Sequence, residues 1–148
     1  MTLISAILPT ARKRLVTIQD TGAVVEAARL LSGAHTSLVI VCNPKGLMSG
    51  VITKADVVRQ ISTCTGCSCT TAVSDIMTRE VIACSPDQRL SDVWTTMRDN
   101  ALRQIPIRDD DLHPLGLLYA NDALELLLKD VEYEQLLLRD YVMGIGYH

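Results

Sequence analysis

Two aspartates occupy matching places in two similar stretches of the chain and are the first candidates for chemistry. Asp56 lies in GVITKADVV, residues 50–58, and Asp122 lies in GLLYANDAL, residues 116–124. A carboxylate can accept hydrogen bonds from two neighbouring hydroxyl groups of a bound molecule, and the hydroxyl of Thr53 can add a further contact. Thr53 and Asp56 can equally form a capping box that starts a helix, with the carboxylate near the positive end of the helix dipole.

The second copy of the motif helps to separate these two interpretations. Tyr119 takes the place of Thr53 there and cannot cap a helix in the same way, yet Asp122 is present. If capping were the whole role of the aspartate, loss of the capping residue should relax the requirement for its partner. The comparison therefore favours a ligand-binding role for both aspartates.

A third candidate site is the stretch CTGCSC, which holds Cys64, Cys67 and Cys69. A structural zinc ion usually takes four protein ligands. The fourth ligand would have to come from elsewhere: Cys42, Cys84, His35 or a partner chain. A redox pair of cysteines has the same spacing, but the usual thioredoxin-like context is missing. The alternative is a linker of small residues whose thiols have no function.

The two aspartates belong to an internal repeat. Corresponding residues of its two halves are separated by the same number of positions as Asp56 and Asp122, and this constant offset defines the repeat. Residues 15–18 (LVTI) correspond to 81–84 (VIAC), and 38–41 (LVIV) correspond to 104–107 (QIPI); all four stretches favour strands. Both halves also carry apolar residues at the i, i+3, i+4, i+7 spacing of a buried helix face: Val24, Ala27, Ala28 and Leu31, then Leu90, Val93, Trp94 and Met97. Each half therefore predicts the order β-α-β-β-α.

A half of this size cannot cover both faces of its own sheet, so we expect the repeats to pack sheet against sheet, with clefts where they meet. The leading segments correspond as well, because ISAIL (4–8) resembles VSDIM (73–77). The first half then carries three extra residues within the basic run Arg12-Lys13-Arg14. The predicted fold is mixed α/β (α+β) in three parts: a first repeat at 1–66, a second at 67–128 and a C-terminal helical tail at 129–148.

The pattern VSDIMTREVIACSPDQRLSDVWTTM…RQIPI…GLLYANDAL resembles a cystathionine-β-synthase (CBS) domain. The two halves together resemble a tandem CBS pair, often called a Bateman module, over residues 4 to about 128. The resemblance implies a regulatory module without catalytic activity that binds adenosine-containing ligands: AMP, ADP, ATP, S-adenosylmethionine or NAD-type dinucleotides. It also implies a flat homodimer whose ligand state is read by an effector protein.

The resemblance implies two sites. Thr53 and Asp56 are expected to contact a ribose in the first, and Asp122 in the second, where the ring of Tyr119 could fill the cleft or stack on a base. An apolar slot would hold the purine of each ligand. The slot residues implied by the resemblance are Leu15, Val16 and Ile40 for the first site, and Val81, Ile82 and Pro106 for the second.

Phosphate groups would require cations. The candidates are Arg12, Lys13 and Arg14 for the first site and Arg103 for the second, although a short basic run can also be a solvated loop. Neither half carries the glycine-rich fingerprint of a Rossmann site or the P-loop motif. We expect the first site to bind more tightly, because it keeps both ribose-facing groups and lies beside the basic run.

Composition narrows the function classes. The net charge of −3 argues against non-specific nucleic-acid binding, and no apolar run is long enough for a membrane span. Five cysteines without a secretion signal predict a cytoplasmic protein with reduced thiols. The three histidines, His35, His113 and His148, are scattered and no nucleophile–base set is recognisable, so we do not expect an enzyme.

The C-terminal stretch DALELLLKDVEYEQLLLRDYVMGIGYH is typical of a long helix with an apolar stripe. The stripe consists of Leu126, Leu127, Val131, Leu136, Leu137, Tyr141 and Val142. Part of the stripe must cover the second repeat. The apolar residues beyond residue 130 exceed what that repeat can cover, and they predict pairing with the same helix of a second subunit, and hence a homodimer. Two alternatives to nucleotide sensing stay open: a metal- or redox-responsive protein that uses Cys64, Cys67 and Cys69, and a dimerisation scaffold with empty clefts.

Overall fold

The computed structural model describes residues 2–33, 37–63 and 71–146, with side chains in the last helix described at 120–132 and 135. The first repeat contains β1 (Thr17–Gln19), α2 (Val24–Leu31), β2 (Leu38–Cys42), β3 (Met48–Thr53) and α3 (Lys54–Thr63). The second contains α4 (Leu90–Asp99), β4 (Gln104–Arg108), β5 (Pro114–Tyr119) and α5 (Ala120–Gly146). The leading segments are η1 (Ile4–Ala6) with α1 (Leu8–Arg14), and η3 (Val73–Asp75).

Both repeats build the same antiparallel hairpin. β2 pairs with β3 and β4 pairs with β5, while β1 runs parallel to β2 at the other edge of the first sheet. The register is shared, because Val41 pairs with Gly50 and Ile107 pairs with Gly116, each immediately before an irregularity in the ladder. The constant offset seen in the sequence is thus preserved in the strand pairing.

Residues 81–84, all of which the structure describes, do not form the strand that the sequence predicts. Only Cys84 makes a parallel bridge to β4. In the first repeat, the N–H of Ile40 donates to the carbonyl oxygen of Val16 over 2.9 Å. The residue that corresponds to Ile40 is Pro106, which has no N–H to donate. The parallel ladder is therefore interrupted in the second repeat.

The two sheets pack against each other, as the repeat predicts. One apolar cluster between them draws residues from both repeats: Leu38, Ile40, Cys42, Val51 and Leu117, with Leu15, Met48, Val81 and Tyr119 at its margin. A separate core fills each repeat between its sheet and its helices. The predicted mixed α/β fold of two repeats joined through their sheets is confirmed.

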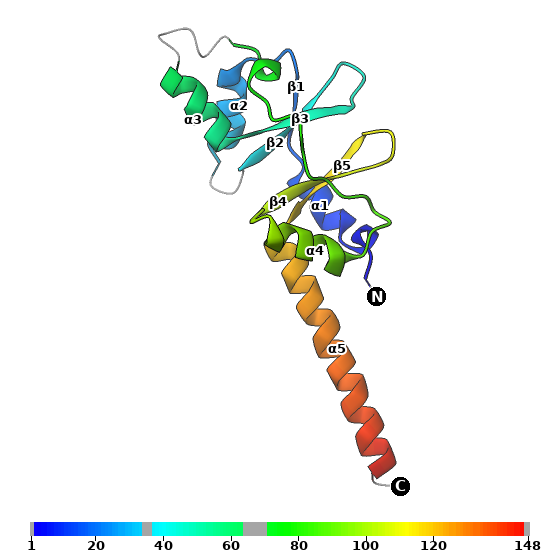
Figure 1. Cartoon of the computed structure of the whole chain (residues 1–148). Helices are drawn as coiled ribbons and strands as arrows, with labels where there is room; N and C mark the ends of the chain where they lie inside the picture. The colour runs from blue at the N-terminus through cyan, green and yellow to red at the C-terminus, as the bar shows by residue number, and fades with distance from the viewer. Residues whose placement is uncertain (1, 34–36, 64–70, 147–148) are drawn as a thin grey trace.

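Each leading segment packs on the opposite repeat, so that α1 lies against the β4–β5 hairpin (Figure 1). Ile4, Ile7 and Ala11 are buried in the core of the second repeat. Val73 is buried in the core of the first repeat. Each core is therefore completed by the segment that leads the other half, and the sequence boundaries at residues 66 and 128 stay a prediction.

The repeated glycines leave room for these exchanged segments. A Cβ atom on Gly50 would lie 2.6 Å from the carbonyl oxygen of Thr78. A Cβ atom on Gly116 would lie 2.8 Å from the Cβ of Ala11 and 2.9 Å from its carbonyl carbon. Both distances are too short for a side chain, so each motif needs a glycine where the opposite leading segment crosses it.

The last helix, α5, continues beyond the body of the protein (Figure 1). Leu124, Leu128 and Val131 are exposed along its described part, and their spacing places them on one face. The apolar side chains predicted beyond Val131 lie outside the described side chains. Among the described residues, no helix combines the length and the apolar character that crossing a membrane requires.

Candidate functional site

At the first motif, Thr53 and Asp56 form a capping box at the start of α3. The Oδ2 atom of Asp56 accepts hydrogen bonds from the backbone N–H of Thr53 at 3.0 Å and from its hydroxyl at 3.2 Å. In return, the Thr53 hydroxyl oxygen accepts from the backbone N–H of Asp56 at 3.3 Å. Asp56 is 5% exposed, and Arg59 lies 3.5 Å from its Oδ1 atom. The helix cap therefore accounts for both side chains in this structure.

At the second motif, Asp122 forms an ion pair with Arg14 and takes no part in a helix cap like that of Asp56. Nε of Arg14 donates to Oδ2 of Asp122 at 2.9 Å, and Nη2 donates to Oδ1 at 3.0 Å. The guanidinium also lies over the ring of Tyr119, 4.3 Å from the centroid. The hydrogen bond to Asp122 raises the pKa of Arg14 above its ordinary value, so the guanidinium stays charged at neutral pH.

The structure brings Arg14 to the second motif, whereas the sequence places the run Arg12–Arg14 beside the first. The reason is the exchange of leading segments: α1 packs on β5, and its last residue reaches Asp122. Arg12 and Lys13 are exposed on the same helix. At the first motif, the residue that corresponds to Arg14 is Glu80, which is also exposed. The corresponding positions of the two leading segments thus carry opposite charges.

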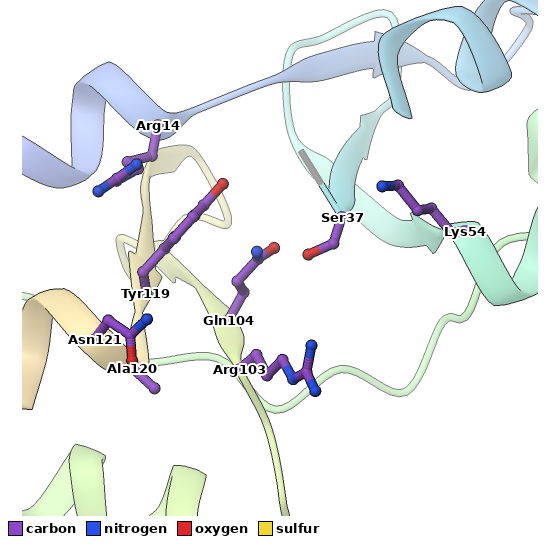
Figure 2. Close-up of a pocket in the computed structure, with 8 residues that line it drawn as sticks. All are labelled: Arg14, Ser37, Lys54, Arg103, Gln104, Tyr119, Ala120 and Asn121. Atoms are coloured by element: carbon purple, nitrogen blue, oxygen red, sulfur yellow. The ribbon is translucent and has the colours of Figure 1, made fainter. Parts of the chain in front are cut away.

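A cavity of about 600 Å³ opens between the two repeats (Figure 2). The residues that line it are Arg14, Ser37, Lys54, Arg103, Gln104, Tyr119, Ala120 and Asn121. The side chain of Gln104 projects between Tyr119 on one side and Ser37 on the other (Figure 2). The volume lies within the range of small-molecule sites in proteins.

The cavity is positively charged. Three of its lining residues are cations, Arg14, Lys54 and Arg103, and none is a carboxylate. Within the described part of the chain, neither Lys54 nor Arg103 has a carboxylate at ion-pair distance. Oε1 of Gln104 is buried and accepts no hydrogen bond from any described residue. Surplus cations with an unused buried acceptor suit a ligand that carries both an anionic group and an N–H donor.

Each aspartate lines a smaller groove beside a leading segment rather than this cavity. Asp122 lines a groove of about 180 Å³ between α1 and α5. The corresponding groove at the first motif, of about 260 Å³, is lined by Asp56, Arg59, Gln60, Asp75 and Ile76. Each groove is lined by two carboxylates and one cation, with Glu125 and Lys129 beside Asp122, so both are poor environments for phosphate.

The predicted purine-slot residues belong mainly to packed regions. Ile40 is 0% exposed, and Val81 packs in the same cluster between the sheets. Val16 packs on the core of the first repeat, and Pro106 is buried. Ile82 is exposed. None of these side chains is among the residues that line the cavity, so a role in a purine slot stays a prediction.

The cysteine stretch with Cys64, Cys67 and Cys69 lies outside the described residues, as does His35. The two distant cysteines considered as a fourth metal ligand, Cys42 and Cys84, are buried and form no disulfide. Burial raises the pKa of Cys42, and it raises the pKa of Cys84 to about 12. Both thiols are therefore protonated at neutral pH, and a role for either as a metal ligand stays a prediction.

Five of the cavity residues are not singled out by the sequence: Ser37, Lys54, Gln104, Ala120 and Asn121. The repeat nevertheless contains a signal for three of them. Ser37 corresponds to Arg103, and Lys54 corresponds to Ala120, each at the constant offset of the repeat. A cavity lined by such pairs lies across the pseudo-symmetry axis, where the first and second repeats contribute equivalent positions. Gln104 and Asn121 have no such partner in the lining, so the cavity is asymmetric.

Several curated proteins with CBS domains are similar to this chain in sequence. The mitochondrial CBS domain-containing protein CBSX3 of Arabidopsis thaliana is 28% identical over 135 residues, 88% of this chain and 64% of that protein. The chain spans only 20% and 59% of the length of two other curated relatives.

Two solved structures share the fold. The CBS domain pair of protein MJ0100, in complex with 5′-methylthioadenosine and S-adenosyl-L-methionine, has a TM-score of 0.71 at 22% identity and covers 88% of this chain and 98% of that one. CBSX2 in complex with AMP has a TM-score of 0.74 at 19% identity and covers 87% and 98%. The CBS domain model itself matches twice, over residues 4–63 and 73–129. The chain therefore belongs to the CBS domain family and carries two copies of the domain.

Proposed function

We propose that this protein is a regulatory module that binds an adenosine-containing nucleotide in the cavity between its two repeats. The observation that carries the proposal is the set of three cations, Arg14, Lys54 and Arg103, around a cavity without a lining carboxylate. The ring of Tyr119 offers a face on which a base can stack. The unused acceptor of Gln104 suits an amino group such as that of adenine. Solved members of the family hold AMP, S-adenosyl-L-methionine or ATP.

The proposed site differs from the one that the sequence ranks first. Asp56 is buried in its capping box, and the groove beside it also contains Asp75. Like charges at that groove oppose a phosphate, whereas the cavity beside Tyr119 attracts one. We therefore place the nucleotide at the second motif, with its phosphate at the cations and its ribose directed toward Asp122.

The rest of the proposal concerns the role of the ligand. Ligand occupancy is read by an effector protein, and the chain does no catalysis of its own. Two copies associate through the exposed face of α5 that carries Leu124, Leu128 and Val131. A cytoplasmic location and the absence of nucleic-acid and membrane partners complete the proposal.

Thermal unfolding with AMP, ADP, ATP, S-adenosylmethionine and NAD tests the function. A ligand that binds only the folded state at a hundredfold excess over Kd stabilises it by about 2.7 kcal/mol, which raises Tm by several degrees for a chain of this size. Lys54→Ala and Arg103→Ala should each weaken nucleotide binding about tenfold, because each removes a charge-assisted contact to phosphate. Lys45→Ala is the matched control, since Lys45 is exposed in the β2–β3 turn. An unmoved Tm with all five ligands would reject the proposal.

A further inference from the structure

We propose that Arg14 makes nucleotide binding in the cavity conditional on a negatively charged group in the ligand. The inference rests on the proposed function and assigns a specificity-determining residue to it. Arg14 lines the cavity, while the carboxylate that it holds, Asp122, lies outside the lining. Arg14 therefore stands between the ligand and the aspartate that would accept the ribose hydroxyls.

Both oxygens of Asp122 are already in use. The guanidinium donates to them at 2.9 and 3.0 Å in a bidentate pair. The pair is partly buried, with the Arg14 side chain 36% exposed and that of Asp122 15% exposed. The ring of Tyr119 covers the guanidinium from one side. A ligand that approaches Asp122 from the cavity must displace the guanidinium of Arg14, because Arg14 lines the cavity and Asp122 does not.

The charge of the ligand decides whether this separation is compensated. A neutral nucleoside supplies two hydroxyls to Asp122 but leaves the guanidinium of Arg14 without an acceptor. A nucleotide supplies both partners, because the planar guanidinium fork fits a phosphate as well as a carboxylate. The apparent affinity of the neutral ligand therefore equals its intrinsic affinity multiplied by the small fraction of molecules in which the Arg14–Asp122 pair is open.

The first motif has no equivalent arrangement. Asp56 bonds to Thr53 of its own motif, and the position that corresponds to Arg14 holds Glu80. The difference lies in the residues at the corresponding positions, because α1 packs on β5 and ends at Arg14, whereas the second leading segment has Glu80 there. The charge requirement thus belongs to the second motif alone.

Isothermal titration of AMP and adenosine into the wild type and Arg14→Gln tests the inference. In the wild type, AMP should bind at least tenfold more tightly than adenosine. In Arg14→Gln, AMP should bind more weakly and adenosine more tightly, because Asp122 becomes accessible. The gain for adenosine is the informative sign, since a residue that only contacts phosphate would leave adenosine binding unchanged. Lys45→Gln, in the exposed β2–β3 turn, should change neither affinity.

Arg14→Lys covers the case in which Arg14→Gln does not fold. Lysine keeps the charge but cannot form the bidentate pair, so adenosine binding should increase by a smaller factor. If AMP binds the wild type while adenosine gains nothing in either variant, the role of Arg14 is wrong and the proposed function stands. If neither ligand binds the wild type or any variant, this inference is wrong, and the proposed function fails with it only when ADP, ATP, S-adenosylmethionine and NAD also leave Tm unmoved.

Discussion

The two motifs share their glycine, their aspartate and their strand register, yet the two aspartates do different things. Asp56 is satisfied within its own motif, by the backbone and hydroxyl of Thr53. Asp122 follows Tyr119 and is held by Arg14, which comes from a segment more than a hundred residues earlier. A repeated residue therefore keeps its place in the fold while its partner, and with it its function, is decided by the segment that packs against it.

The same comparison explains the location of the cavity. α1, which packs on the second motif, ends at Arg14, whereas the corresponding position of the second leading segment holds Glu80. Arg14 adds a positive charge to the wall of the cavity on the side of the second motif. Five predictions test how far this difference extends, beginning with the feature that the two motifs share.

The largest effect is expected where the leading segments cross the glycines. Gly50→Ala and Gly116→Ala should each lower the free energy of unfolding by about 1–3 kcal/mol, because each Cβ meets the backbone of the opposite segment. For Gly116→Ala, the loss should shrink in an Ala11→Gly background, which removes the closest contact, at 2.8 Å. Urea denaturation of the four variants of this cycle measures the coupling, and full additivity would contradict the packing described for α1.

The two aspartates should differ in their contribution to stability. Asp56→Ala leaves the partly buried N–H of Thr53 without an acceptor and should lower the free energy of unfolding by about 1–3 kcal/mol. Asp122→Ala breaks a partly exposed ion pair and should cost about 0–1 kcal/mol. Asp99→Ala, in an exposed pair with Arg98, serves as the reference. A larger loss from Asp122→Ala would reverse the roles assigned to the two residues.

The helices that follow the motifs should differ in self-association. α3 is described as far as Thr63, whereas α5 is described as far as Gly146 and exposes Leu128 between two other apolar residues. Leu128→Glu should weaken dimerisation at least tenfold, because burial of a leucine contributes about 1.5–3 kcal/mol. Lys129→Glu changes charge on the same helix and should leave the dimer intact. Light scattering over a concentration series measures the dissociation of both variants. A monomeric wild type would show that the proposed dimer is wrong.

Ligand binding should depend on Tyr119 and hardly on Thr53. Tyr119→Ala removes a wall of the cavity and a stacking surface, so the Kd for AMP should rise about tenfold. Tyr119→Phe keeps the ring and should stay close to the wild type. Thr53→Ala should change the Kd less than threefold, since Thr53 is engaged in the helix cap. Equal losses from Tyr119→Ala and Thr53→Ala would mean that both motifs hold ligand.

The smallest effect concerns the turns of the two hairpins, which use the same hydrogen bonds with different chemistry. Oδ1 of Asn43 accepts from the backbone N–H groups of Lys45 and Leu47. Oδ1 of Asp109, the equivalent residue of the second repeat, accepts from those of Asp111 and His113. The N–H of His113 lowers the pKa of Asp109, whereas the amide of Asn43 does not titrate.

Since the pKa of Asp109 is lower in the folded protein, its contribution to stability is present above the pKa of the unfolded chain and is lost as the pH falls through the folded value. Asp109→Asn should therefore flatten the acid limb of the stability–pH curve slightly. Thermal unfolding between pH 2 and pH 7 measures this change. An unchanged acid limb in Asp109→Asn would show that the turn does not respond to protonation.

Sequence analysis predicts the repeat, most of the elements and the family, because periodicity and offset are local properties of the chain. Two features depend on contacts distant in sequence and are missed. Pro106 has no N–H, so the strand predicted at residues 81–84 does not form. This effect can be recognised only from the first repeat, where the corresponding Ile40 donates its N–H to Val16. The assignment of Arg14 to the wrong motif follows from reading adjacency along the chain, whereas α1 crosses to the other repeat.

A crystal structure of the protein with AMP tests the central claim most directly. We expect ligand density in the cavity beside Tyr119, with the phosphate within hydrogen-bond distance of Lys54, Arg103 or Arg14. We also expect the hydrogen bonds between Arg14 and Asp122 to be broken. Density confined to the groove beside Thr53 and Asp56, with Arg14 still bonded to Asp122, would contradict it.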